Sequence, residues 1–379
     1  MPLRLTATWL SVLVAAAALL AATGYRTRDA DSRAYIAIAA RMAGEPASRW
    51  IAPQWWGAWG GQGLFREHPA GAFVPAALLT RAGYPAGQSQ FVVTLAAQVM
   101  ALLALSALCR AVVPAPHARL LVWALQLIPI AFVFRVRANQ EYLLLAALLV
   151  ALYGLERART AAAWALVAVG GTIAALLVKG VFGLLAPVLA ALWLWSRRRH
   201  GAPGAAGWLT LLAMAAAPLA LAWAYERVYV AATGQSFLGY YLGSRIGLEA
   251  GGLPFPANKI WNALWYLGRL MWYAAPWSAL GAMALAAWRP AAAQPAGAQT
   301  WVRFALLAAG AIVALVAARD TRADRYIFPA YFFAASGGLV WASVRWARVA
   351  ALAERLDETW PWGPAVLWLL LVAGRVAVG

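Results

Sequence analysis

The sequence is poor in charged side chains. Only 12% of its 379 residues are charged, and 64% are hydrophobic, with a mean hydropathy of +0.69; a soluble domain carries about 25% charged residues. The apolar residues form runs of about 17 to 25, the length that spans a bilayer as a helix. These runs do not alternate with polar residues as membrane barrel strands do. The composition therefore predicts an all-α, polytopic transmembrane helical bundle.

Cysteine, acidic residues and nucleotide-binding motifs are also scarce. Cys109 is the only cysteine, which excludes an internal disulfide and a cysteine zinc site. The net charge is +18, from 31 basic and 13 acidic residues. Because the basic residues are scattered through short loops between apolar runs, they are typical of membrane orientation, and no nucleic-acid partner is expected. The glycine-rich motifs G-x-G-x-x-G and G-x-x-x-x-G-K-[ST] do not occur.

The apolar runs predict about eleven membrane spans. They cover residues 6–24, 90–113, 118–135, 140–156, 162–178, 180–196, 207–227, 262–287, 301–318, 326–345 and 362–378. The first run is expected to be an uncleaved signal anchor. Residues 70–82 are apolar but too short to span, so we expect an interfacial or re-entrant segment. Residues 290–299 form a Pro/Ala-rich linker. No repeat and no soluble C-terminal domain are expected, so residues 1–379 form a single domain.

Charge predicts the orientation. The loop at 196–201 carries three arginines and no acid, which places it in the cytoplasm together with the N-terminus. The opposite face then holds the two long external segments, 25–89 and 228–261. It also holds both lysines and eight of the 13 acids: Lys179, Lys259, Asp29, Asp31, Glu45, Glu67, Glu141, Glu249, Asp320 and Asp324. Chemistry is expected at this face.

Two aspartates follow the first span. After Asp31 the apolar residues recur at helical spacing, and Gly44 and Pro46 stop the pattern, so residues 32–43 predict a short amphipathic helix on the outer surface. In a purely structural interpretation, Asp31 is the N-cap of this helix and has no role in chemistry. In the same interpretation, Asp29 is a solvated ion-pair partner of Arg26 or Arg28.

The same stretch resembles a known family. A span followed by D-x-x-x-Y-x-x-I-A, here Asp31, Tyr35, Ile38 and Ala39, is similar to the first external loop of C-type glycosyltransferases, in the group of bacterial aminoarabinose (lipid A) transferases and protein O-mannosyltransferases. Further elements resemble the family's in the same order: Glu67-His68-Pro69, Arg137-Ala138-Asn139-Gln140-Glu141, residues 176–192 with Lys179-Gly180, Ala275-Pro276-Trp277-Ser278 and Arg325-Tyr326-Ile327-Phe328-Pro329. The chain departs from the pattern at His68, Ala70 and Ser32, where relatives often have Lys, Pro and Glu.

The resemblance implies a membrane glycosyltransferase of a bacterial inner membrane. Such an enzyme moves a sugar from a polyprenyl-phosphate donor to the hydroxyl of an acceptor lipid, glycan or protein on the non-cytoplasmic face. Asp31 takes the family position of the general base, and Asp29 is the second candidate. The candidates for holding donor phosphate or sugar are His68, Lys179, Arg269, Arg322, Arg325, Tyr326 and Glu141.

Each candidate has a second interpretation. The cations could be interfacial side chains that extend to water, and Glu141 could cap a helix end beside Arg137. Arg269 is less ordinary, because it lies within a run that is otherwise apolar and aromatic, and an intramembrane arginine usually faces a polar cavity. No cofactor is expected, although a carboxylate pair could hold a divalent metal weakly. The expected partners of the protein are the lipid-linked donor, membrane lipids and the acceptor.

Two other classes of protein stay open. A secondary transporter would show half-chain repeats and helices broken at matching positions, and neither is seen. A non-catalytic membrane scaffold, or a transferase that has lost activity, would fit the departure at Ala70. The identities of the sugar and the acceptor are not specified by the sequence.

Overall fold

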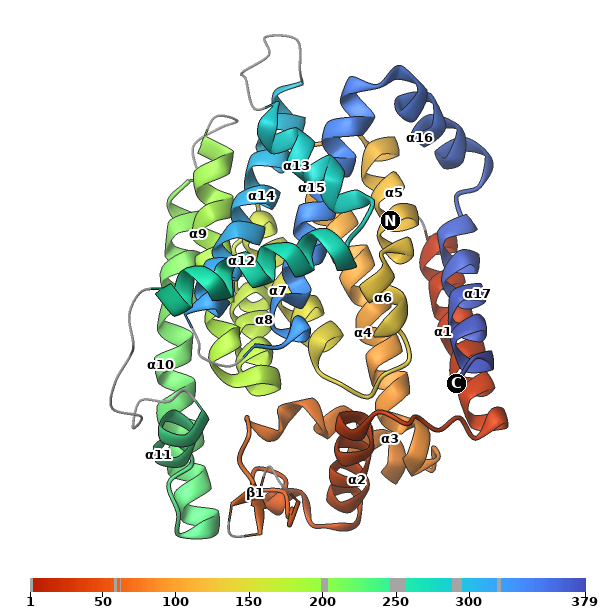
Figure 1. Ribbon diagram of the computed structural model, residues 1–379. Helices are drawn as coiled ribbons and strands as arrows, with labels where there is room; N and C mark the ends of the chain where they lie inside the picture. Colours follow the sequence, from red (N-terminus) through yellow and green to blue (C-terminus); the bar gives the residue numbers. More distant parts are fainter. Residues whose placement is uncertain are drawn as a thin grey trace.

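A computed structural model describes residues 3–57, 60–61, 63–198, 204–245, 257–287, 295–318 and 322–379. The chain forms a helical bundle, which confirms the expected fold class (Figure 1). The longer helices are α1 (Leu3–Thr23), α4 (Ala86–Cys109), α7 (Glu141–Ala158), α8 (Trp164–Lys179), α9 (Leu185–Arg197), α10 (Ala205–Thr233), α12 (Ala257–Tyr273), α14 (Ala296–Ala317), α15 (Phe328–Arg345) and α17 (Gly363–Ala377).

Shorter elements connect these helices and cover the two ends of the bundle (Figure 1). The short α-helices are α2 (Ala30–Gly44), α3 (Val74–Arg81), α5 (Ala115–Ala124), α6 (Pro129–Val133), α11 (Phe237–Tyr240), α13 (Trp277–Ala286) and α16 (Ala347–Thr359). The single turns of tighter or wider helix are η1 (Ala47–Arg49), η2 (Ala70–Ala72), η3 (Leu125–Leu127), η4 (Gly180–Leu184), η6 (Tyr241–Arg245) and η7 (Asp324–Ile327). Strands β1 (Gly60–Gly61) and β2 (Leu64–Phe65) form a small antiparallel pair.

The expected number of spans is not confirmed. By length and composition, six helical segments among the described residues are suited to crossing a membrane, or seven if the bent pair α16 and α17 is one span. The expected span 118–135 is divided among α5, η3 and α6, because Pro129 forces Ile128 into an extended conformation. The expected span 262–287 is divided into α12 and α13 at Pro276, which has no N–H to continue the helix.

The segment Trp164–Arg197 counts as one span by composition, yet it doubles back at η4. Near its start, the ring of Trp164 lies 5.5 Å from that of Tyr153 in the last turns of α7. Near its end, the indole N–H of Trp193 donates to Glu156 on the same part of α7 at 2.9 Å. Both ends of the segment therefore lie beside one end of α7, so α8 and α9 run in opposite directions, as expected for residues 162–178 and 180–196.

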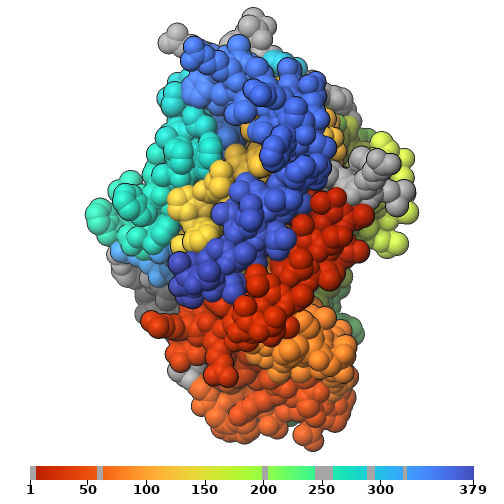
Figure 2. Space-filling model, turned by 90° about the vertical axis from the view of Figure 1, so that its right-hand side faces the viewer, coloured from red at the N-terminus to blue at the C-terminus, as the bar shows by residue number. Residues whose placement is uncertain are grey.

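The first and last helices lie side by side. Figure 2 shows α1 and α17 crossing one face of the molecule together, with residues of the first long external segment below them. The indole rings of Trp9 and Trp368 meet edge to face at 6.3 Å between these helices. Large aromatic side chains contribute much of the apolar contact area in such packing.

Two groups of ion-paired residues lie at opposite ends of the bundle. At one end, Glu156 pairs with Arg159 at 3.0 Å and with Arg197 at 2.9 Å. At the other end, the first external segment brings Asp29 and Asp31 to the start of α7 and to η7. Glu249 and Asp320, which were expected at this second end, lie outside the described residues.

Which end faces the cytoplasm is a prediction that a reporter fusion tests. Arg198 follows the last residue of α9 and precedes α10 in the sequence, whereas Gly234 follows the last residue of α10. We expect a reporter that works only in the cytoplasm to be active when fused after Arg198 and inactive after Gly234, because the arginine cluster at 197–199 is retained inside. Activity only at Gly234 would place the candidate site in the cytoplasm.

Candidate active site

Helix α2 is capped by Asp29, not by Asp31. The Asp29 carboxylate accepts the backbone N–H of Ser32 at 3.1 Å and the Ser32 hydroxyl at 2.6 Å, both at Oδ2. The capping role suggested for Asp31 is therefore wrong. Asp29 pairs with Arg137 and not with Arg26 or Arg28, because the Asp29 Oδ1 atom lies 3.7 Å from Arg137 Nη1. A carboxylate at the N-cap position accepts a backbone N–H that has no partner within the first turn of the helix.

Asp31 instead reaches across the site to Arg325. It lies in the first turn of α2, and its carboxylate forms an ion pair with the Arg325 guanidinium on η7. About a fifth of the Asp31 side chain is exposed (21%), so the pair is open on one side. This contact brings together the candidate base and a candidate phosphate ligand, which are far apart in the sequence.

Glu141 and Lys179 form the buried ion pair of the site. Lys179 Nζ lies 2.8 Å from Glu141 Oε1, and the two residues are 8% and 3% exposed. The alternative interpretation that paired Glu141 with Arg137 is therefore wrong. Glu141 Oε2 is buried and has no hydrogen-bond partner among the described residues. A buried carboxylate oxygen without a partner costs about 1–3 kcal/mol, and a ligand hydroxyl would remove that cost.

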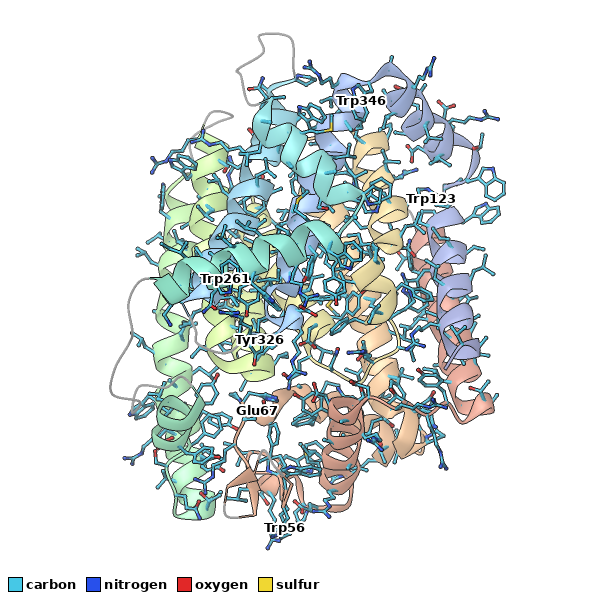
Figure 3. All side chains as sticks on the ribbon, viewed as in Figure 1. Trp56, Glu67, Trp123, Trp261, Tyr326 and Trp346 are labelled. Carbon is cyan, nitrogen blue, oxygen red and sulfur yellow. The ribbon has the colours of Figure 1, made fainter. Side chains whose placement is uncertain are left out.

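Tyr326 stands beside this ion pair. Lys179 Nζ lies 5.9 Å from the centre of the Tyr326 ring, and the Phe182 ring packs against the same tyrosine at 5.5 Å. Figure 3 shows Tyr326 where the helices of the bundle meet the first external segment, which carries Glu67. The two candidates Lys179 and Tyr326 therefore belong to one site.

His68 is buried among aromatic rings and contacts Gln140. Its Nδ1 lies 3.1 Å from the Pro69 carbonyl oxygen, and the Gln140 amide nitrogen lies within hydrogen-bond distance of the ring nitrogens. These contacts fix the orientation of the His68 ring beside Gln140, the residue that precedes Glu141.

Arg269 and Arg322 lie on the flank of the site. The Nε atom of Arg269, on α12, lies 3.3 Å from Asp324 Oδ1. Arg322 Nε donates to Asn262 Oδ1 at 2.5 Å. Asp324 is adjacent in sequence to Arg325, so these two arginines are joined to the site through η7.

Tyr35 and Ser32 are site residues that the sequence did not single out as such. Burial raises the pKa of the Tyr35 hydroxyl well above its usual range, and nearby groups raise it further, in the order Glu67, Glu141, Tyr326 and Asp29. Because these groups come from the first external segment, α7 and η7, Tyr35 marks the place where these three parts of the chain meet. The Ser32 hydroxyl accepts the backbone N–H of Ala138 at 3.0 Å and thereby joins α2 to the segment before α7.

No metal site is evident in the parts of the chain that the structure describes, where no three His, Cys, Asp or Glu side chains come together. The carboxylates of the site are each directed at a cation: Asp29 at Arg137, Asp31 at Arg325 and Glu141 at Lys179.

The arrangement of the helices is similar to that of multi-pass membrane proteins whose structures have been solved. The crystal structure of ArnT from Cupriavidus metallidurans in the apo state matches 93% of this chain and 62% of its own, with a TM-score of 0.66 and 14% identity. The same protein bound to undecaprenyl phosphate matches 97% and 63%, with a TM-score of 0.65 and 15% identity.

A third solved structure has the same general fold. The Archaeoglobus fulgidus oligosaccharyltransferase in the apo form matches 97% of this chain and 56% of its own, with a TM-score of 0.50 and 13% identity. The chain thus spans less than two thirds of the length of these proteins. No family model and no curated protein sequence matches it. The resemblance expected from the motifs is therefore confirmed at the level of the fold.

The buried ion pair generates a prediction about stability. Lys179→Met leaves the Glu141 carboxylate charged and buried, and breaking such a pair on one side costs about 3–5 kcal/mol. We expect a large drop in the thermal unfolding midpoint of the purified protein in detergent. The double variant Lys179→Met, Glu141→Gln removes both charges and should recover most of the loss. Equal midpoints for the single and double variants would contradict a coupled pair.

Proposed function

We propose that the protein transfers a sugar from a polyprenyl-phosphate donor to an acceptor hydroxyl on the non-cytoplasmic face of a bacterial inner membrane. The observation that carries this proposal is the ion pair between Asp31 and Arg325, which sets a carboxylate beside a cation in a fold like that of ArnT. A transferase of this kind needs a base for the acceptor hydroxyl and a cation for the phosphate that leaves. The undecaprenyl phosphate bound to ArnT supports a lipid-linked donor.

Asp31 is the better candidate for the base. Asp29 already uses one carboxylate oxygen to cap α2 and directs the other toward Arg137. The Asp31 carboxylate would accept the proton of the acceptor hydroxyl as its oxygen bonds to the anomeric carbon. As this bond forms, the bond from the anomeric carbon to the phosphate oxygen breaks, and that oxygen keeps the electron pair, so the leaving polyprenyl phosphate gains a negative charge. A phosphate that engages Arg325 takes this cation from Asp31 and leaves the carboxylate available.

Two buried acceptor atoms suit the hydroxyl groups of the donor sugar. Glu141 Oε2 and Asn139 Oδ1 are both buried without a hydrogen-bond partner among the described residues, and they lie two positions apart at the start of α7. Sugar hydroxyls would satisfy both oxygens. The ion pair with Lys179 holds the Glu141 carboxylate in place, and Lys179 itself lies next to Tyr326 in the same cluster.

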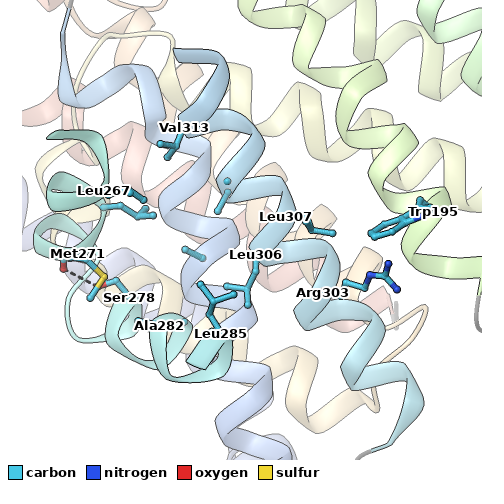
Figure 4. A pocket seen from close by; sticks show the side chains of 15 residues that line it. Trp195, Leu267, Met271, Ser278, Ala282, Leu285, Arg303, Leu306, Leu307 and Val313 are labelled. Atoms are coloured by element: carbon cyan, nitrogen blue, oxygen red, sulfur yellow. Dashed lines mark hydrogen bonds between the residues drawn. The ribbon is translucent and has the colours of Figure 1, made fainter. Parts of the chain in front are cut away.

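An apolar cavity of about 620 Å³ suits the polyprenyl chain. It lies among α12, α13, α14 and α15, and its walls are mostly aliphatic, with Trp195 of α9 and Arg303 of α14 also lining it (Figure 4). Leu267, Leu270 and Met271 of α12 line it, and Arg269 lies between them in the sequence. Because Arg269 pairs with Asp324 at 3.3 Å, the cavity adjoins the flank of the charged site. A chain in this cavity would bring its phosphate toward Arg269 and Arg322.

A transporter is less well supported. The carboxylates with cationic partners gather where the bundle meets the first external segment, and a transport site lies near the middle of the membrane. An inactive scaffold would have no need for the two unsatisfied buried oxygens at Asn139 and Glu141, which are costly to retain without a ligand.

Replacement of the candidate base tests the mechanism. We expect Asp31→Asn to leave the unfolding midpoint within a few degrees of the parent, because Asp31 is partly exposed, and to lower transfer at least about 100-fold, the lower range for a general base. Asp29→Asn, the matched control, should also leave the midpoint near that of the parent, because the amide oxygen still accepts the capping hydrogen bond, and it should lower transfer much less. Near-normal turnover by Asp31→Asn would exclude it as the base.

The choice of donor is the second test. Purified protein receives either a nucleotide sugar alone or the matching polyprenyl-phosphate sugar, each with a mixture of lipid and glycan acceptors. We expect turnover only with the lipid-linked donor, because the described residues offer an apolar cavity beside the charged site and the sequence has no glycine-rich diphosphate turn. Turnover with the nucleotide sugar in the absence of any lipid carrier would show the proposed donor to be wrong.

A further inference from the structure

Lys179 is directed into the site by an unusual turn. Helix α8 ends at Lys179, and Gly180 adopts φ 56° and ψ −126° before the chain continues as η4. A positive φ is readily adopted by glycine and strains residues with a β-carbon. Since Lys179 sits at the last position of α8, the direction of its side chain depends on this turn being held.

Tyr241 closes over the turn from a distant part of the chain. It belongs to η6, which follows α10 and α11, and it is 6% exposed. Its hydroxyl oxygen accepts the backbone N–H of Val181 at 3.1 Å. The same hydroxyl occupies the space next to Gly180, where a β-carbon would collide with it. Tyr241 therefore contacts both residues that follow Lys179.

The Tyr241 ring is itself fixed by aromatic packing. It stacks on Phe237 with ring centres 5.4 Å apart and an angle of 14° between the planes. Phe237 in turn meets Tyr225 and Tyr229 of α10 at 5.0 and 5.3 Å. The hydroxyl is thus held by a packed cluster rather than by a mobile side chain, and such packing limits the positions it can take.

We propose that Tyr241 is a positioning residue, whose hydroxyl holds the Gly180–Val181 turn so that Lys179 is directed at Glu141 and Tyr326. Without the hydroxyl, the Val181 N–H loses a partly buried hydrogen bond and the turn gains freedom. Lys179 then spends more time away from Glu141. The second external segment, which carries Tyr241, would in this way control the position of the Lys179 ammonium group in the site. The effect on catalysis rests on the proposed function, whereas the effect on Lys179 does not.

Chemical labelling of lysine measures the position of Lys179 directly. Lys179 and Lys259 are the only lysines in the chain, so mass spectrometry after amine-selective labelling reads Lys179 with Lys259 as an internal reference. In the parent protein we expect Lys179 to react slowly, because it is buried and paired with Glu141. In Tyr241→Phe, the rate at Lys179 relative to Lys259 should rise about three- to tenfold, as expected for the loss of one hydrogen bond.

A second tyrosine of the same cluster serves as the matched control. The Tyr225 hydroxyl donates to the Ile51 carbonyl oxygen at 2.9 Å and accepts the Ala70 N–H at 3.4 Å, and neither partner belongs to the Gly180 turn. Tyr225→Phe should leave the Lys179 labelling rate at the parent value. Gly180→Ala should raise the rate more than Tyr241→Phe does, because it adds both a strained φ and a collision with Tyr241.

The outcomes separate this proposal from the proposed function. Unchanged Lys179 labelling in Tyr241→Phe would overturn the positioning role, whether or not the protein transfers sugar. Equal acceleration in Tyr225→Phe would also overturn it, because the cluster would then act only through general stability. Faster labelling together with a lower kcat/KM for the lipid-linked donor supports both proposals. Faster labelling in a protein that transfers no sugar supports the positioning role and contradicts the proposed function alone.

Discussion

Charge pairing in a water-poor interior is the constraint on which the site depends. Glu141 begins α7 and Lys179 ends α8, so their ion pair joins the two helices where the bundle meets the external segments. A lone buried charge would cost several kcal/mol, whereas the pair at 2.8 Å is tolerated. The pair leaves one carboxylate oxygen of Glu141 unsatisfied. The ion pair therefore joins two helices of the bundle, and it also leaves one buried oxygen of Glu141 that a ligand hydroxyl would satisfy.

The external segments are attached to the bundle by polar contacts that converge on this pair. Asp31 reaches Arg325 on η7, and Ser32 accepts the Ala138 N–H just before α7. Tyr241 contacts the turn after Lys179 from the second segment. Each contact is worth only about 1 kcal/mol or less where it is partly exposed. Their common result is a carboxylate, cations and an apolar cavity in one neighbourhood, as sugar transfer from a lipid phosphate requires.

Much of the site was predictable because several residues occur in short motifs with fixed spacing. The stripe Tyr35, Ile38 and Met42 predicted α2, and all three are buried. The capping residue was misassigned, since Asp29 and Asp31 are both acceptable at a helix start and only the backbone conformation distinguishes them. The interpretation that paired Glu141 with Arg137, the nearer arginine in sequence, was also wrong, because a bundle brings together side chains from different helices.

The sequence by itself determined that the chain is a helical membrane protein. Apolar runs of this length span a bilayer, and in lipid a helix satisfies the backbone hydrogen bonds within each run. The sequence also determined the candidate base region, because a local motif needs no long-range information. Only the tertiary structure decided how the expected span 118–135 breaks at Pro129 and which cation pairs with which acid. Hydropathy records how apolar a run is, whereas helix direction and ion pairing depend on neighbours that are distant in sequence.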